Sequence, residues 1–225
     1  MKIGIIGFSP EKDKITFKDS RLDKLEEFYK AKKKTYITIS LIKDNLIEAD
    51  GIVCLESEKL ELIFKDLELT EKYIESQPEK RELFIKLKEG LEKEKFISEL
   101  DLSEEDRQFL ANMNLLSLKP VYLLKEQENF SKEIGEIIAS CGYISYFTAG
   151  EKEARAWLIK KGVTAPLAAG IIHSDIERGF IKAEVVNWPD IEKATTVHDL
   201  KPVMRLEGKE YIVCDGDSLI FRFNK

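Results

Sequence analysis

Short apolar, strand-like runs alternate with helical segments over the first two thirds of the chain, and this alternation restricts the fold more than any other feature. Several runs are rich in β-branched residues, and turn residues bound them, as is typical of buried strands. They lie at residues 2–7, 36–42, 51–55, 119–124 and 143–147. Strands that alternate with helices pair in parallel, so residues 1–147 are predicted to form a mostly parallel α/β sheet.

A charged segment from about residue 58 to residue 99 interrupts the alternation. Its leucines and isoleucines recur every three or four residues on both sides of Pro78, which predicts two helices joined at Gln77-Pro78. We interpret the charges as a solvated outer face with i,i+4 ion pairs, and a partner-specific surface is the alternative. Ser103, followed three residues later by Asp106, predicts the cap of a further short helix.

The pattern changes after Gly150. Residues 151–160 are predicted to form an amphipathic helix that carries Trp157 on its apolar face. Residues 171–186 and 211–223 are predicted to form two hairpins, the second turning at Asp215-Gly216. Two hairpins around one helix make a small α+β domain. We therefore predict a first domain at residues 1–149, with the helical hairpin inserted at about 56–112, and a second at residues 150–225.

Charge is distributed unevenly over the 225 residues, which include 36 basic and 42 acidic side chains. From residue 142 onward there are 12 of each sign, so the whole net charge of −6 belongs to the preceding part. An acidic chain is not a natural binder of polyanions. Contact with RNA would therefore need a local basic patch in the neutral C-terminal part.

Cysteine usage and apolar runs indicate the cellular environment. Three widely spaced cysteines in apolar contexts predict reduced thiols, and with only His173 and His198 besides we predict no metal site. No run approaches the roughly 18 apolar residues that span a bilayer, and the N-terminus turns polar too soon for a signal peptide. We expect no membrane association and a cytoplasmic location.

A series of short phrases follows one another through the C-terminal part. They are Arg155-Ala-Trp157, Lys161-Gly162, Ala165-Pro166, Ile172-His173-Ser-Asp175, Gly179-Phe180-Ile, Ala183-Glu-Val185, Tyr211-Ile-Val213 and Asp215-Gly216-Asp217. In this order they resemble the TGS domain that ends the proteins of the YchF family, the Obg-like ATPases, over nearly all of residues 142–224. The resemblance implies a β-grasp, ubiquitin-like fold for this part.

Upstream phrases resemble the same family more sparsely but in the same order. They are Asp19-Ser-Arg-Leu-Asp-Lys-Leu25, residues 59–73, Leu102-Ser-Glu-Glu-Asp106 and Lys119-Pro-Val121. They are similar to a strand-to-helix phrase, an inserted helical hairpin, the exit from that hairpin and the next strand. The whole chain thus resembles a shortened YchF protein: a degenerate P-loop GTPase-like α/β domain with an inserted hairpin, followed by a TGS domain.

The nucleotide-binding motifs of that family are altered in this sequence. A P-loop needs glycines whose N–H groups wrap phosphates, a lysine, and a serine or threonine for the metal, yet Gly7 is followed by Phe-Ser-Pro-Glu-Lys-Asp-Lys. Glu11 and Asp13 would repel phosphate. Lys43 stands where the family has the aspartate of its second switch, and Glu126 where it has a base-recognising asparagine. These departures predict loss of nucleotide hydrolysis.

The resemblance implies a non-catalytic binding or regulatory module that needs no cofactor. Through its TGS domain it would contact the ribosome, tRNA or a protein partner. The alternative is a regulator that binds ATP or GTP with magnesium and turns it over weakly or not at all. A homodimer is a further option, because a second copy could cover an exposed edge of the truncated sheet.

The candidate RNA- or partner-binding residues are His173, Asp175, Arg178, Lys182, Lys201 and Arg205. The resemblance implies contact with RNA near His173, which could stack on a base or hydrogen-bond to it. A catalytic His-Ser-Asp relay is disfavoured, because neighbours on a strand point to opposite faces. A structural turn and scattered surface charge are the alternatives to RNA contact.

Overall fold

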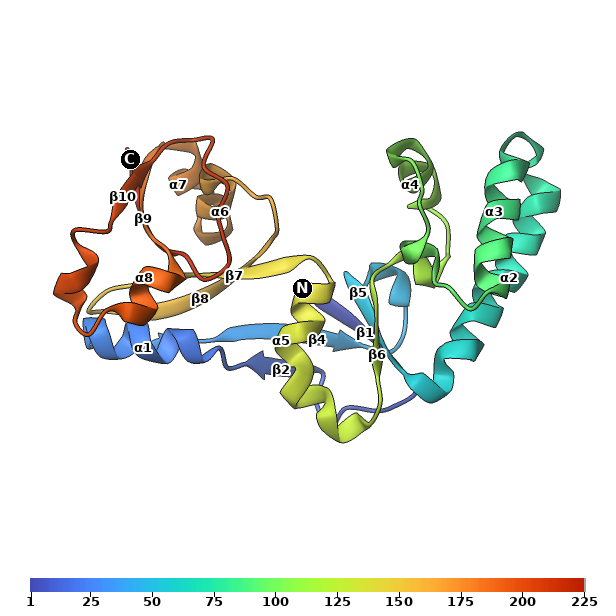
Figure 1. The fold of residues 1–225 in the computed structure, drawn as a ribbon, viewed down its shortest axis with the longest axis horizontal. Coiled ribbons are helices and arrows are strands. Elements are labelled where there is room, and N and C mark those ends of the chain that lie inside the picture. The colour runs from blue at the N-terminus through green and yellow to red at the C-terminus, as the bar shows by residue number, and fades with distance from the viewer. Residues whose placement is uncertain (225) are drawn as a thin grey trace. The chain divides into compact units, whose positions relative to one another are not determined.

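The computed structural model describes residues 1–224 as two compact units between which the chain passes more than once (Figure 1). Unit 1 contains Met1–Ile15 and Ile39–Cys141, and unit 2 contains Thr16–Thr38 and the chain from Gly142 onward. This division differs from the expected boundary at residue 149, because residues 16–38 and 142–149 belong with the C-terminal part. Two independently folding domains at 1–149 and 150–225 stay a prediction.

Unit 1 is built on a five-stranded sheet in the order β2-β4-β1-β5-β6. The strands are β1 (Lys2–Ile6), β2 (Lys14–Phe17), β4 (Ile37–Ile42), β5 (Gly51–Leu55) and β6 (Val121–Leu124). β1 pairs in parallel with β4 and β5, and β5 with β6, which confirms the predicted parallel sheet. Apolar residues of β1 and β5 are buried on both faces, as in the central strands of a parallel sheet. β2 and β6 form its edges, and pairing of an edge with a second copy stays a prediction.

The predicted helical hairpin is confirmed. Helix α2 (Lys59–Ser76) and helix α3 (Arg81–Glu92) are separated by a 3-10 turn that begins at Pro78. The rings of Tyr73 and Phe84 stack between them with centroids 5.2 Å apart. Helix α4 (Glu104–Leu110) begins after Ser103, whose Oγ accepts the Asp106 N–H at 3.1 Å as the predicted cap.

One further helix and several single 3-10 turns complete unit 1. The helix is α5 (Phe130–Ser140), which follows β6. The turns are η1 (Leu46–Glu48), η2 (Glu56–Glu58), η3 (Pro78–Lys80), η4 (Ile97–Glu99), η5 (Leu116–Leu118) and η6 (Gln127–Asn129).

Unit 2 is built on a six-stranded mixed sheet in the order β10-β9-β11-β7-β8-β3. The strands are β3 (Lys34–Thr35), β7 (Tyr143–Ala149), β8 (Ala154–Lys160), β9 (Phe180–Val186), β10 (Arg205–Glu207) and β11 (Ser218–Phe223). β7 and β8 form an antiparallel hairpin, while β11 lies parallel to β7 and antiparallel to β9. An opening hairpin, a helix and a last strand parallel to the first make a β-grasp arrangement, as the TGS resemblance implies.

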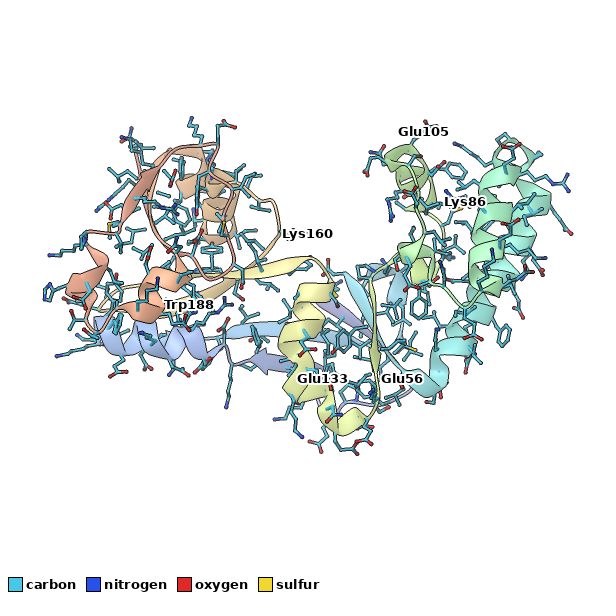
Figure 2. The ribbon with its side chains drawn as sticks, viewed as in Figure 1. Glu56, Lys86, Glu105, Glu133, Lys160 and Trp188 are labelled. Carbon is cyan, nitrogen blue, oxygen red and sulfur yellow. The ribbon has the colours of Figure 1, made fainter. Side chains whose placement is uncertain are left out.

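Helices cover both faces of this sheet. They are α1 (Ser20–Tyr29), α6 (Ala165–Ile172), α7 (Ser174–Arg178) and α8 (Trp188–Lys193, with Trp188 labelled in Figure 2), with a 3-10 turn η7 (Val197–Leu200). On β7, the Tyr146 hydroxyl donates to the Ala168 carbonyl of α6, whereas the next residue, Phe147, lies under the Arg21 guanidinium of α1. Neighbours on a strand point to opposite faces, so α6 and α1 cover opposite faces.

Four expectations for unit 2 are wrong. Residues 151–160 form no helix; Ala154–Lys160 is β8, which pairs with β7 along its whole length. Residues 171–186 form no hairpin, because α6 and α7 precede β9. The Asp215-Gly216 turn leads into β11, but residue 212 makes only a single bridge to Thr164. β7, expected in the sheet of the first domain, instead pairs within unit 2.

Within residues 1–224, the structure contains no helix that is both long enough and apolar enough to cross a membrane.

Candidate functional site

The first candidate region lies in unit 1, where β1 ends. The chain leaves β1 through Gly7, which has a left-handed conformation (φ +93°). The ring of the next residue, Phe8, packs edge-on against the ring of Phe130, with the ring centroids 5.4 Å apart. Phe130 begins α5. The aromatic contact therefore connects the segment that follows β1 with the segment that follows β6. Ligands of parallel α/β sheets bind outside this carboxyl edge.

A crevice of about 400 Å³ opens beside the two rings. Its walls come from the β1–β2 connection, β2, β4, η6 and the start of α5: Phe8, Pro10, Glu11, Lys12, Lys14, Ile15, Leu41, Gln127, Glu128, Phe130 and Ser131. Pro10 has no N–H group to offer a phosphate, and two carboxylates line the crevice. The geometry is therefore unlike a P-loop, which surrounds phosphates with consecutive backbone N–H groups.

The second candidate region lies in unit 2 around His173. This residue ends α6 and precedes α7, and its Nδ1 accepts the Asp175 N–H at 3.1 Å as a cap of α7. The Asp175 carboxylate forms an ion pair with Arg178. That hydrogen bond to Arg178 lowers the pKa of Asp175, which keeps the carboxylate ionised near neutral pH. The side chains of all three residues are more than half exposed to solvent.

These three residues form the rim of a shallow, mostly apolar groove of about 940 Å³. Its remaining lining consists of Ile172, Ile176, Gly179, Phe223 and Asn224. The floor includes Phe223, which lies opposite Phe180 because the β9–β11 register shifts between Arg222 and Phe223 and leaves Ile181 of β9 without a pairing partner on β11. A bulge of this kind re-aims a side chain at a strand end.

The other predicted binding residues lie outside this groove. Lys182 is exposed on β9, opposite Arg222, and Lys201 follows η7. Arg205 lies on β10, where its guanidinium is 3.4 Å from the Tyr211 hydroxyl. The structure therefore brings His173, Asp175 and Arg178 together and leaves Lys182, Lys201 and Arg205 apart from the groove. Whether any of the six residues binds a partner stays a prediction.

His173 lies between two helices and not on a strand, so the expected strand geometry around it is wrong. This capping role agrees with the structural-turn alternative. The imidazole is still mostly exposed to solvent, so a partner could reach it. The sequence reasoning missed Phe223, Ile172 and Ile176 as the floor of the groove. The apolar run at the end of the chain was a signal, but the β-bulge that turns Phe223 was not predictable.

The two aspartates of the Asp215-Gly216-Asp217 phrase hold different parts of unit 2. Asp215 accepts from Arg21 at 2.6 Å and from the Ser145 N–H at 2.9 Å. Asp217 accepts from the Tyr211 hydroxyl at 2.7 Å and from the Cys214 N–H at 2.8 Å. Among residues 1–224, no three potential metal ligands gather closely enough to hold an ion. Both carboxylates thus stabilise the turn and its surroundings.

The fold and these regions define a class: a two-unit α/β protein with a parallel sheet and a β-grasp unit. Residues 143–224 match the family described as YchF-GTPase_C, Protein of unknown function (DUF933). The structure also resembles that of the Schizosaccharomyces pombe YchF GTPase, with a TM-score of 0.75 and 21% identity. That match covers 96% of this chain and 88% of the other, and it supports the fold.

Three curated relatives extend the comparison. The ribosome-binding ATPase YchF of Bacillus subtilis (strain 168) is 34% identical over 248 residues, which cover 79% of this chain and 68% of that protein. The Haemophilus influenzae protein of the same name is 42% identical, over 57% of this chain and 33% of its own length. Obg-like ATPase 1 of Pongo abelii is 39% identical, over 55% and 29%. The chain belongs to the YchF family.

The comparison with the Bacillus subtilis protein also bears on the length of the chain. The 248-residue alignment is longer than the 225 residues of this chain, so the relative has segments within the aligned range that this chain lacks. The chain spans about two thirds of that relative and one third of the Haemophilus influenzae protein.

Proposed function

We propose that this chain is a YchF-family protein that binds ribosomes through unit 2 and has lost nucleotide hydrolysis. The observation that carries the proposal is the end of β1, where Phe8 packs on Phe130 in place of a glycine-rich phosphate loop. A phosphoryl-transfer site depends on positioning and electrostatic stabilisation of the phosphates. Without the cradle of N–H groups, and with Glu11 and Glu128 lining the crevice, those requirements are unmet.

Ribosome binding is supported by the relatives and by the charge of unit 2. Curated relatives in several bacteria are named ribosome-binding ATPases, and the matched family covers nearly all of unit 2 after residue 142. Unit 2 contains 19 basic and 16 acidic residues, which leaves 17 basic and 26 acidic residues in unit 1. A unit with a net positive charge is the part of an acidic chain that suits a polyanionic partner.

Within unit 2 the groove beside His173 is the proposed recognition site. Phe223 and two isoleucines offer an apolar floor, while His173 and Arg178 offer hydrogen-bond donors at the rim. Unpaired RNA bases are recognised by stacking and by hydrogen bonds along their edges. The finer choice among ribosomal RNA, tRNA and a ribosomal protein rests on the experiment.

Co-sedimentation of the purified chain with ribosomes across a salt series tests this function. Binding is expected to weaken as salt rises, and a His173→Ala, Arg178→Ala double variant is expected to bind at least about tenfold more weakly at low salt. The control is a Lys72→Ala, Lys93→Ala variant, which removes two exposed cations from unit 1. Absence of wild-type binding at low salt would contradict the proposal.

A second candidate function is a regulator that binds ATP or GTP with magnesium. The crevice beside β1 favours it, because α5 begins there without a side-chain cap and Lys12 and Lys14 line the walls. If magnesium were bound with a nucleotide, it would neutralise phosphate charge. Titration of the chain with magnesium-ATP and magnesium-GTP separates the candidates. Saturable binding at micromolar nucleotide would establish the second candidate and contradict the account given for Phe8 and Pro10.

A further inference from the structure

A lysine-rich turn connects α1 to β3 in unit 2. Four of the five residues from 30 to 34 are lysines. Lys30 caps α1 in a left-handed conformation (φ 48°), which turns the chain sharply out of the helix. Lys30, Lys32 and Lys33 are exposed to solvent. Lys34 instead forms ion pairs with Asp23 and Glu26, so it is already compensated.

The turn lies against the connection between β7 and β8. The Lys32 N–H donates to the Glu151 carbonyl at 3.0 Å, and the Ala154 N–H donates to the Lys33 carbonyl at 2.9 Å. β3 then pairs in parallel with β8, which places Thr35 beside Arg155. Figure 1 shows α1 ending at the same end of unit 2 as the β7–β8 connection. The segments that contain Lys32 and Lys152, 120 residues apart in the sequence, thus lie side by side.

We define the lysine-turn surface as Lys30, Lys32, Lys33, Lys152 and Arg155. Two carboxylates lie in the same connections, Glu151 and Glu153. The Glu153 carboxylate forms an ion pair with the Lys33 Nζ at 3.2 Å and accepts a hydrogen bond from the Thr35 hydroxyl at 2.6 Å. Within residues 1–224, Lys30, Lys32 and Lys152 take part in no ion pair. The five cations exceed the two carboxylates by three charges.

Arg155 adds a side chain held by an aromatic contact to this surface. Its guanidinium lies 4.1 Å from the centre of the Trp157 ring, a cation–π contact that holds the planar group in place. The indole N–H of Trp157 donates to the Thr148 hydroxyl at 2.9 Å, which fixes the ring in turn. A basic surface with a positioned arginine and an adjacent aromatic ring is typical of nucleic-acid contacts.

The charge of the segment that supplies the turn favours a polyanionic partner over simple helix stabilisation. Residues 16–38 contain seven basic and four acidic residues, whereas the rest of unit 2 is balanced at 12 each. The whole positive excess of unit 2 therefore comes from this segment. Only Lys30, the C-cap residue, is placed to complement the helix dipole of α1, whereas Lys32 and Lys33 lie beyond the helix end.

We propose that the lysine-turn surface contacts the phosphate backbone of ribosomal RNA. This inference rests on the proposed function, and it adds a sequence-independent contact that is separate from the groove at His173. Mobile lysines bind phosphates as point charges, and each contact releases counterions when RNA binds. The surface would supply affinity and salt dependence, while the groove would supply recognition.

The test compares the salt dependence of binding for two matched triple variants of the full chain. Lys30→Gln, Lys32→Gln, Lys152→Gln removes the uncompensated lysines of the surface. Lys72→Gln, Lys93→Gln, Lys95→Gln removes three exposed lysines of unit 1. The slope of log affinity against log salt should fall by about 2 in the first variant and stay unchanged in the second, since each lost contact removes about 0.7 to 0.9.

The probes are intact ribosomes and protein-free ribosomal RNA, and the thermal unfolding midpoint of each variant checks that it folds. A reduced slope on both probes, for the surface variant alone, supports the proposal. An unchanged slope, an equal reduction in the control, or a reduction on ribosomes but not on free RNA would overturn it. Failure of the wild-type chain to bind ribosomes at all would instead refute the proposed function.

Discussion

Asp66 shows how a single buried side chain fastens the helical hairpin to the segment that follows it. Its side chain lies in α2 and is 1% exposed. One carboxylate oxygen accepts the Leu116 N–H at 2.9 Å, and the other accepts the Ser117 N–H at 2.7 Å. Burial raises the pKa of Asp66, and the hydrogen bonds from Ser117 and Leu116 act in the opposite direction.

Removing that carboxylate should destabilise unit 1. Asp66→Ala leaves two N–H groups without their acceptor, so the free energy of unfolding should fall by about 2–3 kcal/mol. Denaturant unfolding followed by circular dichroism measures the change. Glu68→Ala, an exposed position on the same helix, is the control and should alter stability by less than about 0.5 kcal/mol. Equal stability of the two variants would contradict the role given to Asp66.

The burial of Asp217 predicts that the free energy of unfolding depends on pH. It is wholly buried; Oδ2 accepts two hydrogen bonds, whereas Oδ1 has no partner among the described residues. Burial raises the pKa of Asp217 in the folded state. The folded chain therefore takes up this proton at a higher pH than the unfolded chain does. The associated stabilisation is complete below the unfolded pKa of about 3.9 and is lost as pH rises through the folded pKa.

The comparison of wild type with Asp217→Asn isolates this proton. As pH falls from 7 toward 4, the free energy of unfolding of the wild type should increase relative to that of the variant. Denaturant unfolding at several pH values measures the difference, in which other titrating groups cancel. A difference that stays constant, or that shrinks toward acid pH, would show that burial does not raise the pKa of Asp217.

At the scale of elements, α1 is held in unit 2 by Arg21. Its guanidinium bonds to Asp19 and Asp215 and lies within 5.3 Å and 6.0 Å of the ring centres of Phe147 and Trp188. Gly216 makes this possible, because a Cβ there would lie 2.6 Å from the Trp188 Cβ and 2.9 Å from the Arg21 Nη1. A residue near the start of the chain thus depends on a turn 194 residues later.

Arg21→Ala should loosen α1 from the sheet. The variant leaves the buried Asp19 and the half-exposed Asp215 without their cation, and breaking the buried pair with Asp19 costs about 2–4 kcal/mol. Hydrogen exchange should accelerate in residues 20–29 of the variant, and Lys18→Ala, at an exposed neighbouring position, should leave it unchanged. Arg21→Lys should rescue little, since lysine cannot bond both carboxylates bidentately. Unchanged hydrogen exchange in Arg21→Ala would show that Arg21 does not hold α1 on the sheet.

The elements of unit 1 were more predictable than those of unit 2. Four of its strands lie in predicted apolar or alternating runs and its hairpin has a regular helical period, so local pattern sufficed for these elements, whereas β2 (Lys14–Phe17) was not predicted. β8 was misread because Ala154, Trp157 and Leu158 suit one face of a helix, although buried Ala154 and Ala156 alternate with more exposed neighbours. The long pairing with β7 decides the conformation, and a short segment does not reveal its partner.

At the scale of the whole molecule, the sequence predicted part of the candidate site but not how the net charge is divided between the two units. His173, Asp175 and Arg178 are near neighbours in sequence, so their meeting was predictable, whereas Phe223 joins them only through a β-bulge. The C-terminal part alone is neutral. Unit 2 has a net positive charge only because residues 16–38 fold with it, and no local pattern indicates that assignment.

The central claim is that the chain keeps ribosome binding and does without nucleotide. Sedimentation with ribosomes in nucleotide-free buffer, in magnesium-ATP and in magnesium-GTP, with phosphate release followed in the same samples, tests it most directly. The account predicts the same bound fraction in all three and no phosphate release above that of ribosomes alone. Binding that requires one of the nucleotides, or release of phosphate that depends on the chain, would contradict it.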